Sequence, residues 1–131
     1  MVGNIASKAH DCMYCAEHIV TGAGKAGVAA DKLGALWSFE SSALFDDRKR
    51  IALRFAFLGA QSPNGLNDSD CVDMKLYFSD PQIAEILAVV SAYGFFNRWN
   101  DSLATPLEVA PKLTAQEHLA DHGWQLGRHV G

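Results

Sequence analysis

The sequence predicts an all-α domain. Apolar residues recur at three- and four-residue steps along most of the chain, and no stretch alternates apolar and polar residues as a half-buried strand does. The 131 residues are 49% hydrophobic and 20% charged, which is the size and composition of one globular domain with one core. No internal repeat is visible, so we expect residues 1–131 to form a single helical domain.

Three helices are expected in the first half of the chain. The first covers residues 4–23, where small and apolar side chains share a face, and the second covers residues 28–37. The third, over residues 44–60, is the most clearly amphipathic. Its expected apolar stripe consists of Leu44, Ile51, Phe55 and Leu58.

The second half begins after the turn signal Ser62-Pro63-Asn64-Gly65. A short helix to Tyr77 is expected, capped by Asp68 or Asp70. A longer one begins at Ser79, where Pro81 suits the first turn and Gln82 has capping-box spacing, and it continues to about residue 103. Its expected core stripe consists of Ile83, Ile86, Leu87 and Val90.

The C-terminal part is expected to contain a short tail helix. Thr114-Ala115-Gln116-Glu117 is a second capping-box signature, and the helix should stop near Gly123. Pro106 and Pro111 precede it, and we expect the segment that they bracket to be extended. His129 is expected to be terminal and mobile.

Composition excludes several classes of function. The net charge is −4 and no basic stripe is present, which argues against nucleic acid as a partner. No apolar run reaches the roughly 20 residues needed to span a bilayer, and no signal peptide is visible. Three cysteines are an odd number, which argues against a disulfide-stapled secreted fold. We therefore expect a cytoplasmic protein with no membrane partner.

The chemistry of the chain is concentrated in one short stretch, Cys12-Met13-Tyr14-Cys15-Ala16-Glu17-His18. On a helix, residues three apart are neighbours, so the two sulfurs could approach each other and cycle between dithiol and disulfide. His18 follows Cys15 by three residues and could lower its pKa or act as a base. Glu17 points to nearly the opposite side from Cys12.

Other interpretations of the same residues remain open. Both cysteines could be small buried core residues. Structural zinc needs about four ligands, and neither a second C-x-x-C nor a suitably spaced histidine pair follows. His118 and His122 are four apart, a spacing that can hold a metal, but a polar helix face explains them more simply. We expect no metal and no cofactor. Cys71 is expected to be a half-buried helix residue.

Several segments resemble the carboxymuconolactone decarboxylase and alkylhydroperoxidase D superfamily. Cys12-Met13-Tyr14-Cys15 resembles its C-x-[YF]-C element, and the segments at 78–86 and 96–101 resemble its next helix start and its aromatic-Asn-Arg-aromatic-Asn run. The likeness continues into the tail, at Leu107-Glu108 and Gly123-Trp124, so it covers nearly the whole chain in the right order.

The resemblance implies an alkylhydroperoxidase D-like fold that assembles as trimers or hexamers. It implies that Cys15 attacks the substrate and Cys12 resolves the intermediate, with a Glu and a His as proton relay. Two positions differ from the pattern. The family's His falls on Ile19 here, one place after His18, and the family's Glu falls before Met1. That Glu is absent, supplied by another element, or lost with a missing upstream segment.

These observations favour a thiol-dependent oxidoreductase, peroxidase-like, that cycles a Cys12–Cys15 dithiol and disulfide with His18 as assisting base. Its partners would be a hydroperoxide or disulfide substrate and a thiol electron donor. The alternative is a binding or structural member of the same fold that has lost catalysis. A carboxymuconolactone-type decarboxylase is a third possibility, but that branch does not depend on a thiol pair.

Overall fold

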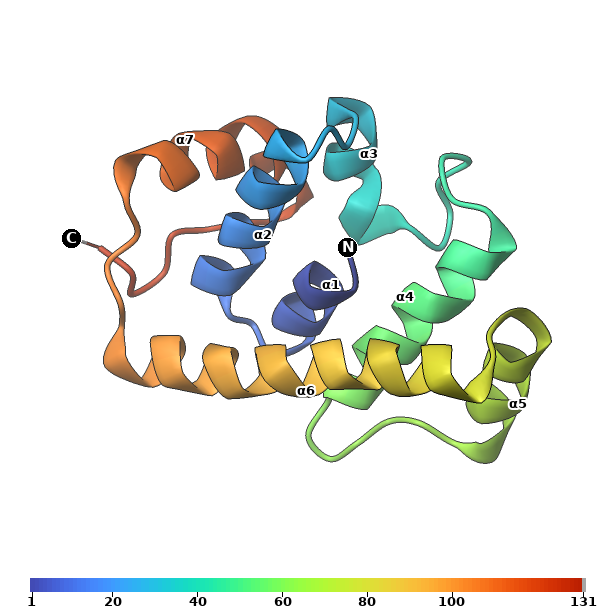
Figure 1. Ribbon diagram of the computed structural model, residues 1–131. Coiled ribbons are helices and arrows are strands. Elements are labelled where there is room, and N and C mark those ends of the chain that lie inside the picture. Colours follow the sequence, from blue (N-terminus) through green and yellow to red (C-terminus); the bar gives the residue numbers. More distant parts are fainter. Residues whose placement is uncertain (131) are drawn as a thin grey trace.

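The computed structural model describes residues 1–130, and every regular element in this range is a helix (Figure 1). The predicted all-α class is confirmed. The elements are α1 (Val2–Ala9), α2 (Met13–Lys25), α3 (Ala30–Gly34), the 3₁₀ helix η1 (Ala35–Ser38), α4 (Asp47–Ala60), α5 (Asp68–Tyr77), α6 (Asp80–Leu103), α7 (Val109–His118) and the 3₁₀ helix η2 (Ala120–His122).

Helix α1 occupies the centre of the fold, packed against α2, α4 and α6 (Figure 1). The ring of Tyr93 on α6 lies so close to Gly3 that no Cβ would fit there without a shift. The buried Asn4 side chain donates to the Ala16 carbonyl at 2.6 Å and accepts from Trp37 Nε1 at 2.8 Å. One polar side chain therefore ties α1 to α2 and to η1, with both of its polar atoms paired.

Two apolar clusters hold the helices together. The first lies between α1, η1, α4 and α6, and the second joins α2, α3 and α7 to the C-terminal segment. The second cluster matters more for the site because it fixes α2 against the tail. Its buried members are Val20, Leu33, Leu107, Ala115, Leu119 and Trp124.

The tail helix differs from the prediction. Helix α7 begins at Val109, so Pro111 lies in its first turn rather than in an extended segment. A proline is tolerated there because the first N–H groups of a helix have no intrahelical acceptor. Thr114 lies inside the helix, where its hydroxyl donates to the Ala110 carbonyl at 3.2 Å. The predicted capping box at Thr114 is therefore wrong.

The other helix starts were predicted more closely. The amide of Ser79 donates to Gln82 Oε1 at 3.0 Å, so this capping interaction is confirmed. Helix α4 begins three residues later than predicted, behind an Asp46 cap that accepts from the Lys49 amide. Asn67 caps α5, with Asp70 as its partner in the capping box.

Helix α6 is much more exposed than its pattern indicates. Of its predicted core stripe only Val90 is buried, and Leu87 is 41% exposed. Phe95, Phe96 and Trp99 are 60%, 48% and 58% exposed, so they are not core residues. The assembly into trimers or hexamers that the resemblance implies stays a prediction. No helix within residues 1–130 combines the length and apolar character needed to cross a membrane.

Candidate active site

The two cysteines do not lie on one continuous helix. The predicted helix over residues 4–23 is broken between Ala9 and Met13, where Asp11 has a left-handed backbone with φ of 57°. Asp is one of the residues that tolerate this conformation. The amide of Cys12 donates to the Ser7 carbonyl, and Cys12 itself caps α2. Cys12 therefore lies at the N-terminus of a helix, with Cys15 at the end of its first turn.

The two thiols of this pair differ in their pKa values. The Cys15 thiol, which donates a hydrogen bond to the Cys12 sulfur, lowers the pKa of Cys12, and the backbone N–H groups of Cys15 and Tyr14 add to that effect against burial. The same hydrogen bond raises the pKa of Cys15, and burial acts in the same direction. The sequence predicted a lowered pKa for Cys15, but in the structure it is the pKa of Cys12 that is lowered.

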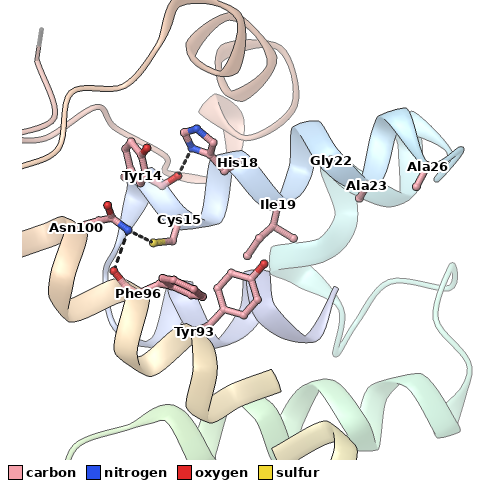
Figure 2. Close-up of a pocket in the computed structure, with 10 residues that line it drawn as sticks. All are labelled: Tyr14, Cys15, His18, Ile19, Gly22, Ala23, Ala26, Tyr93, Phe96 and Asn100. Atoms are coloured by element: carbon pink, nitrogen blue, oxygen red, sulfur yellow. Dashed lines mark hydrogen bonds between the residues drawn. The ribbon is translucent and has the colours of Figure 1, made fainter. Parts of the chain in front are cut away.

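The two sulfurs differ in access as well. Cys12 is fully buried, whereas Cys15 is 4% exposed and lines a groove of about 530 Å³ between α2 and α6 (Figure 2). Asn100 Nδ2 donates to the Cys15 sulfur at 3.6 Å from the α6 side. The walls are mostly apolar and aromatic. The lining residues are Tyr14, Cys15, His18, Ile19, Gly22, Ala23, Ala26, Tyr93, Phe96 and Asn100.

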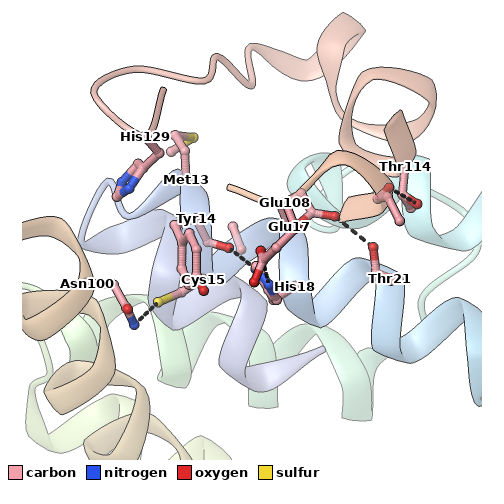
Figure 3. Close-up of polar contacts among 12 residues, drawn as sticks. Met13, Tyr14, Cys15, Glu17, His18, Thr21, Asn100, Glu108, Thr114 and His129 are labelled. Carbon is pink, nitrogen blue, oxygen red and sulfur yellow. Dashed lines mark hydrogen bonds and ion pairs between the residues drawn. The ribbon is translucent and has the colours of Figure 1, made fainter. Parts of the chain in front are cut away.

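His18 lies beside Cys15 on the wall of this groove (Figure 3). Its Nδ1 lies 3.0 Å from the Tyr14 carbonyl, to which it can only donate, and its Nε2 lies 3.0 Å from Glu108 Oε2. Both ring nitrogens thus face oxygen acceptors, which fixes the orientation of the imidazole at the groove. The centroid of the His18 ring lies 4.3 Å from that of the Tyr14 ring, which is tilted against it, and this contact limits the rotation of the imidazole.

Glu17 is a fully buried carboxyl group beside His18. Its Oε1 accepts from the Thr21 hydroxyl at 2.7 Å, and its Oε2 lies 3.4 Å from His18 Nδ1 without a hydrogen bond. Burial raises the pKa of Glu17, the Thr21 hydrogen bond opposes that shift, and so does the charge of His18. The environment of Glu17 therefore favours the protonated form of its carboxyl group.

The stability of the protein should depend on pH through Glu17. The folded state holds a proton on a carboxyl that the unfolded state releases at its usual pKa, so the unfolding free energy falls as pH rises between the two pKa values. The neutral Glu17→Gln variant has no carboxyl group at this position, so its unfolding free energy should not fall with pH in this way. We expect the unfolding free energy of wild type, relative to that of the variant, to fall by about 1.4 kcal/mol per pH unit in this window.

Urea unfolding at a series of pH values, from the ordinary pKa of a glutamate upwards, measures this difference. Glu85→Gln is a matched control, because Glu85 is exposed on α6 and its replacement should leave the pH dependence as in wild type. Parallel pH curves for wild type and Glu17→Gln would contradict the assignment of a raised pKa to Glu17.

The C-terminal segment closes one side of the site. Trp124 Nε1 donates to the Met13 carbonyl at 3.3 Å, inside the C-x-x-C stretch. His129 is only 3% exposed, with Nδ1 at 2.8 Å from the Thr105 carbonyl and Nε2 at 3.7 Å from Asp101. Its predicted mobility is therefore wrong.

Of the predicted site residues, Cys15 and His18 line one groove, and Cys12 lies buried behind Cys15 as its hydrogen-bond partner. Sequence reasoning missed Glu17 and Glu108. Glu17 had a usable signal, because it lies three residues before the buried Val20 and hence on the inward face of α2. Glu108 reaches His18 only through the docking of α7 on α2, which no local pattern encodes.

The remaining reactive side chains stay apart from the groove. Cys71 is exposed on α5 rather than half-buried. His118 ends α7 and His122 lies in η2, so the two do not share one continuous helix. Within residues 1–130, no three His, Cys, Asp or Glu side chains are grouped so that they could hold a metal ion.

No protein-family model matches the chain. The debrominase Bmp8 has a crystal structure that superposes with a TM-score of 0.85 and 34% sequence identity. The chain has the fold of this debrominase. The match covers 88% of this chain and 62% of the debrominase chain, so the chain spans less than two thirds of that protein. The helical fold is of the kind found in the carboxymuconolactone decarboxylase and alkylhydroperoxidase D-like superfamily.

A second Bmp8 structure and one further protein are also similar to this chain. A cysteine-to-alanine variant of Bmp8, solved in complex with 2,3,4-tribromopyrrole, is similar at 33% identity and a TM-score of 0.85. The uncharacterized protein YnjA of Escherichia coli is 23% identical over 97 residues, which make up 74% of this chain and 53% of YnjA.

Proposed function

We propose that the chain is a dithiol-dependent reductase whose substrate binds in the groove between α2 and α6. The observation that carries this proposal is the position of the two sulfurs. Cys15 faces an apolar groove, and Cys12 lies hydrogen-bonded behind it with no access of its own. A substrate in the groove meets Cys15 first, and the covalent product on Cys15 then meets Cys12.

The pair shares one proton in its resting state. The Cys12 thiolate accepts the proton of Cys15 as Cys15 attacks, so the nucleophile forms only when a substrate is in place. After attack, the Cys12 sulfur displaces the group left on Cys15, its proton leaves to solvent, and the Cys12–Cys15 disulfide forms. Two electrons have then passed from the two sulfurs to the substrate.

His18 is the proton donor in this proposal. It lies on the groove wall beside Cys15, and its two ring nitrogens are aligned by the Tyr14 carbonyl and by Glu108. The pair Glu108 and Glu17 takes the place of the carboxyl group that the family pattern puts further upstream. Glu108 is 61% exposed and can exchange protons with water, whereas Glu17 lies buried beside the ring, with its Oε2 3.4 Å from His18 Nδ1.

The first substrate class is a small halogenated aromatic ring. The likeness to Bmp8 and the aromatic walls formed by Tyr14, Tyr93 and Phe96 support it. Cys15 attacks the halogen, the carbon–halogen bond breaks, and the ring carbon takes a proton from His18. Cys12 then displaces halide from the Cys15 sulfur. The balance is one aryl halide, one thiol and one thiolate converted to one arene, one disulfide and one halide.

A hydroperoxide is the second substrate class. The C-x-x-C stretch resembles that of peroxidase-like enzymes, and the apolar groove suits an organic hydroperoxide better than a charged one. Cys15 attacks the distal oxygen, the O–O bond breaks, and the alkoxide takes a proton from His18. Cys12 then displaces water from the sulfenic acid. In both cases an external thiol donor returns the disulfide to the dithiol and is itself oxidised to a disulfide.

Product analysis distinguishes the two classes. Reduced protein in the Cys71→Ser background, which removes the one exposed thiol, is mixed anaerobically with one equivalent of tribromopyrrole or of cumene hydroperoxide. Dehalogenation releases one bromide and a dibromopyrrole per chain, whereas peroxide reduction yields cumyl alcohol. The proposal is wrong if neither product forms and both thiols remain reduced.

A further inference from the structure

The groove extends well beyond Cys15. Its far part is lined by Ile19, Gly22 and Ala23 of α2, by Ala26 directly after α2, and by Tyr93 of α6 (Figure 2). None of these side chains carries a charge, and the phenol of Tyr93 is the one titratable group among them. The near part, by contrast, holds Cys15, His18 and Asn100. The groove therefore has a reactive end and an inert, apolar end.

The inert end is long enough to influence which substrates fit the groove. Gly22 lies seven residues after Cys15, which is about 10 Å along a helix and longer than one aromatic ring. A Cβ built on Gly22 would meet no atom within 4 Å, so the space in front of this residue is open. A single five-membered ring held at Cys15 would leave this part of the groove empty.

We propose that the far part of the groove binds a second ring, so that the substrate is an uncharged two-ring aromatic compound. Gly22 sets the length that fits, because any side chain there projects into the space that the second ring occupies. The chemistry at the first ring rests on the proposed function. The binding of the second ring depends only on shape and apolar contact with Ile19, Ala23 and Tyr93.

The test is the binding of two unreactive probes, naphthol with two fused rings and phenol with one. Neither contains a halogen or a peroxide bond, so binding does not require thiol chemistry. Gly22→Leu should weaken naphthol binding about tenfold or more and leave phenol binding within about twofold. Gly22→Ala is the matched control, since it adds one carbon in open space, and it should bind naphthol nearly as wild type does.

Both variants should fold, because alanine and leucine favour a helix more than glycine does. Titration of naphthol fluorescence gives its dissociation constants, and calorimetry gives those of phenol. Equal naphthol affinity in wild type and Gly22→Leu, or no naphthol binding by wild type, would overturn the assignment of the groove. A groove that behaves as expected in a protein that reduces neither bromopyrrole nor hydroperoxide would contradict the proposed function alone.

Discussion

Replacing Cys15 by serine should abolish turnover, with kcat/KM lowered by about a thousandfold or more. Cys15 is the sulfur that reaches the groove, and Cys12 is fully buried and cannot substitute for it. Comparison with the Cys12→Ser variant distinguishes the roles of the two sulfurs. That variant retains the attacking sulfur and lacks the resolving one, so it should form product once and stop with an oxidised Cys15.

Dimedone trapping and mass spectrometry after reaction with cumene hydroperoxide measure this difference. The adduct should appear on Cys15 in the Cys12→Ser variant and be absent from the Cys15→Ser variant. Cys71→Ser should react as wild type does, since the side chain of Cys71 is exposed on α5 away from the groove. A Cys15→Ser variant that is trapped on Cys12 would reverse the roles assigned to the two sulfurs.

Replacing His18 by glutamine should lower kcat/KM by about a hundredfold to ten-thousandfold, the range for loss of a general acid. The reacting carbon or oxygen would lose its proton donor, while the groove and both thiols remain in place. Because the side chain of His18 is 35% exposed, the variant should fold as wild type does. His122→Gln is the matched control on an exposed histidine outside the groove.

Steady-state kinetics with and without an activated substrate would test this role. A better leaving group needs less help from a proton donor, so the defect of His18→Gln should shrink with an electron-poor hydroperoxide or bromoarene. If the defect is equal for all substrates, or if only KM changes, His18 binds the substrate and does not protonate it. Loss of Glu108 should produce a smaller defect of the same kind.

Local patterns in the sequence predicted the helical class because apolar spacing and capping residues act over a few neighbours. The start of α6 illustrates this, since the Ser79 amide and Gln82 form their cap within one turn. The break before α2 could not be predicted in the same way. Asp11 adopts a left-handed conformation, and small and apolar residues at helical spacing continue across it, so periodicity alone joins α1 to α2.

The pair of cysteines was predicted from the sequence, whereas the difference between their pKa values was not. Spacing alone showed that Cys12 and Cys15 could meet. The pKa of Cys12 is lowered because the Cys15 thiol donates a hydrogen bond to its sulfur, and the N–H groups at the start of α2 add to that effect. The carboxyl partners of His18 came from tertiary packing. Glu108 is ninety positions away in the chain and reaches the ring when α7 docks on α2.

The most direct test of the account is the state of the thiols after a single turnover. Reduced wild-type protein is mixed anaerobically with one equivalent of tribromopyrrole or cumene hydroperoxide and is then analysed by thiol counting, intact mass and peptide mapping. We expect the loss of two thiols and two hydrogen masses, with a Cys12–Cys15 disulfide and Cys71 still reduced. Three intact thiols, while an established thiol reductase reacts in parallel, would contradict it.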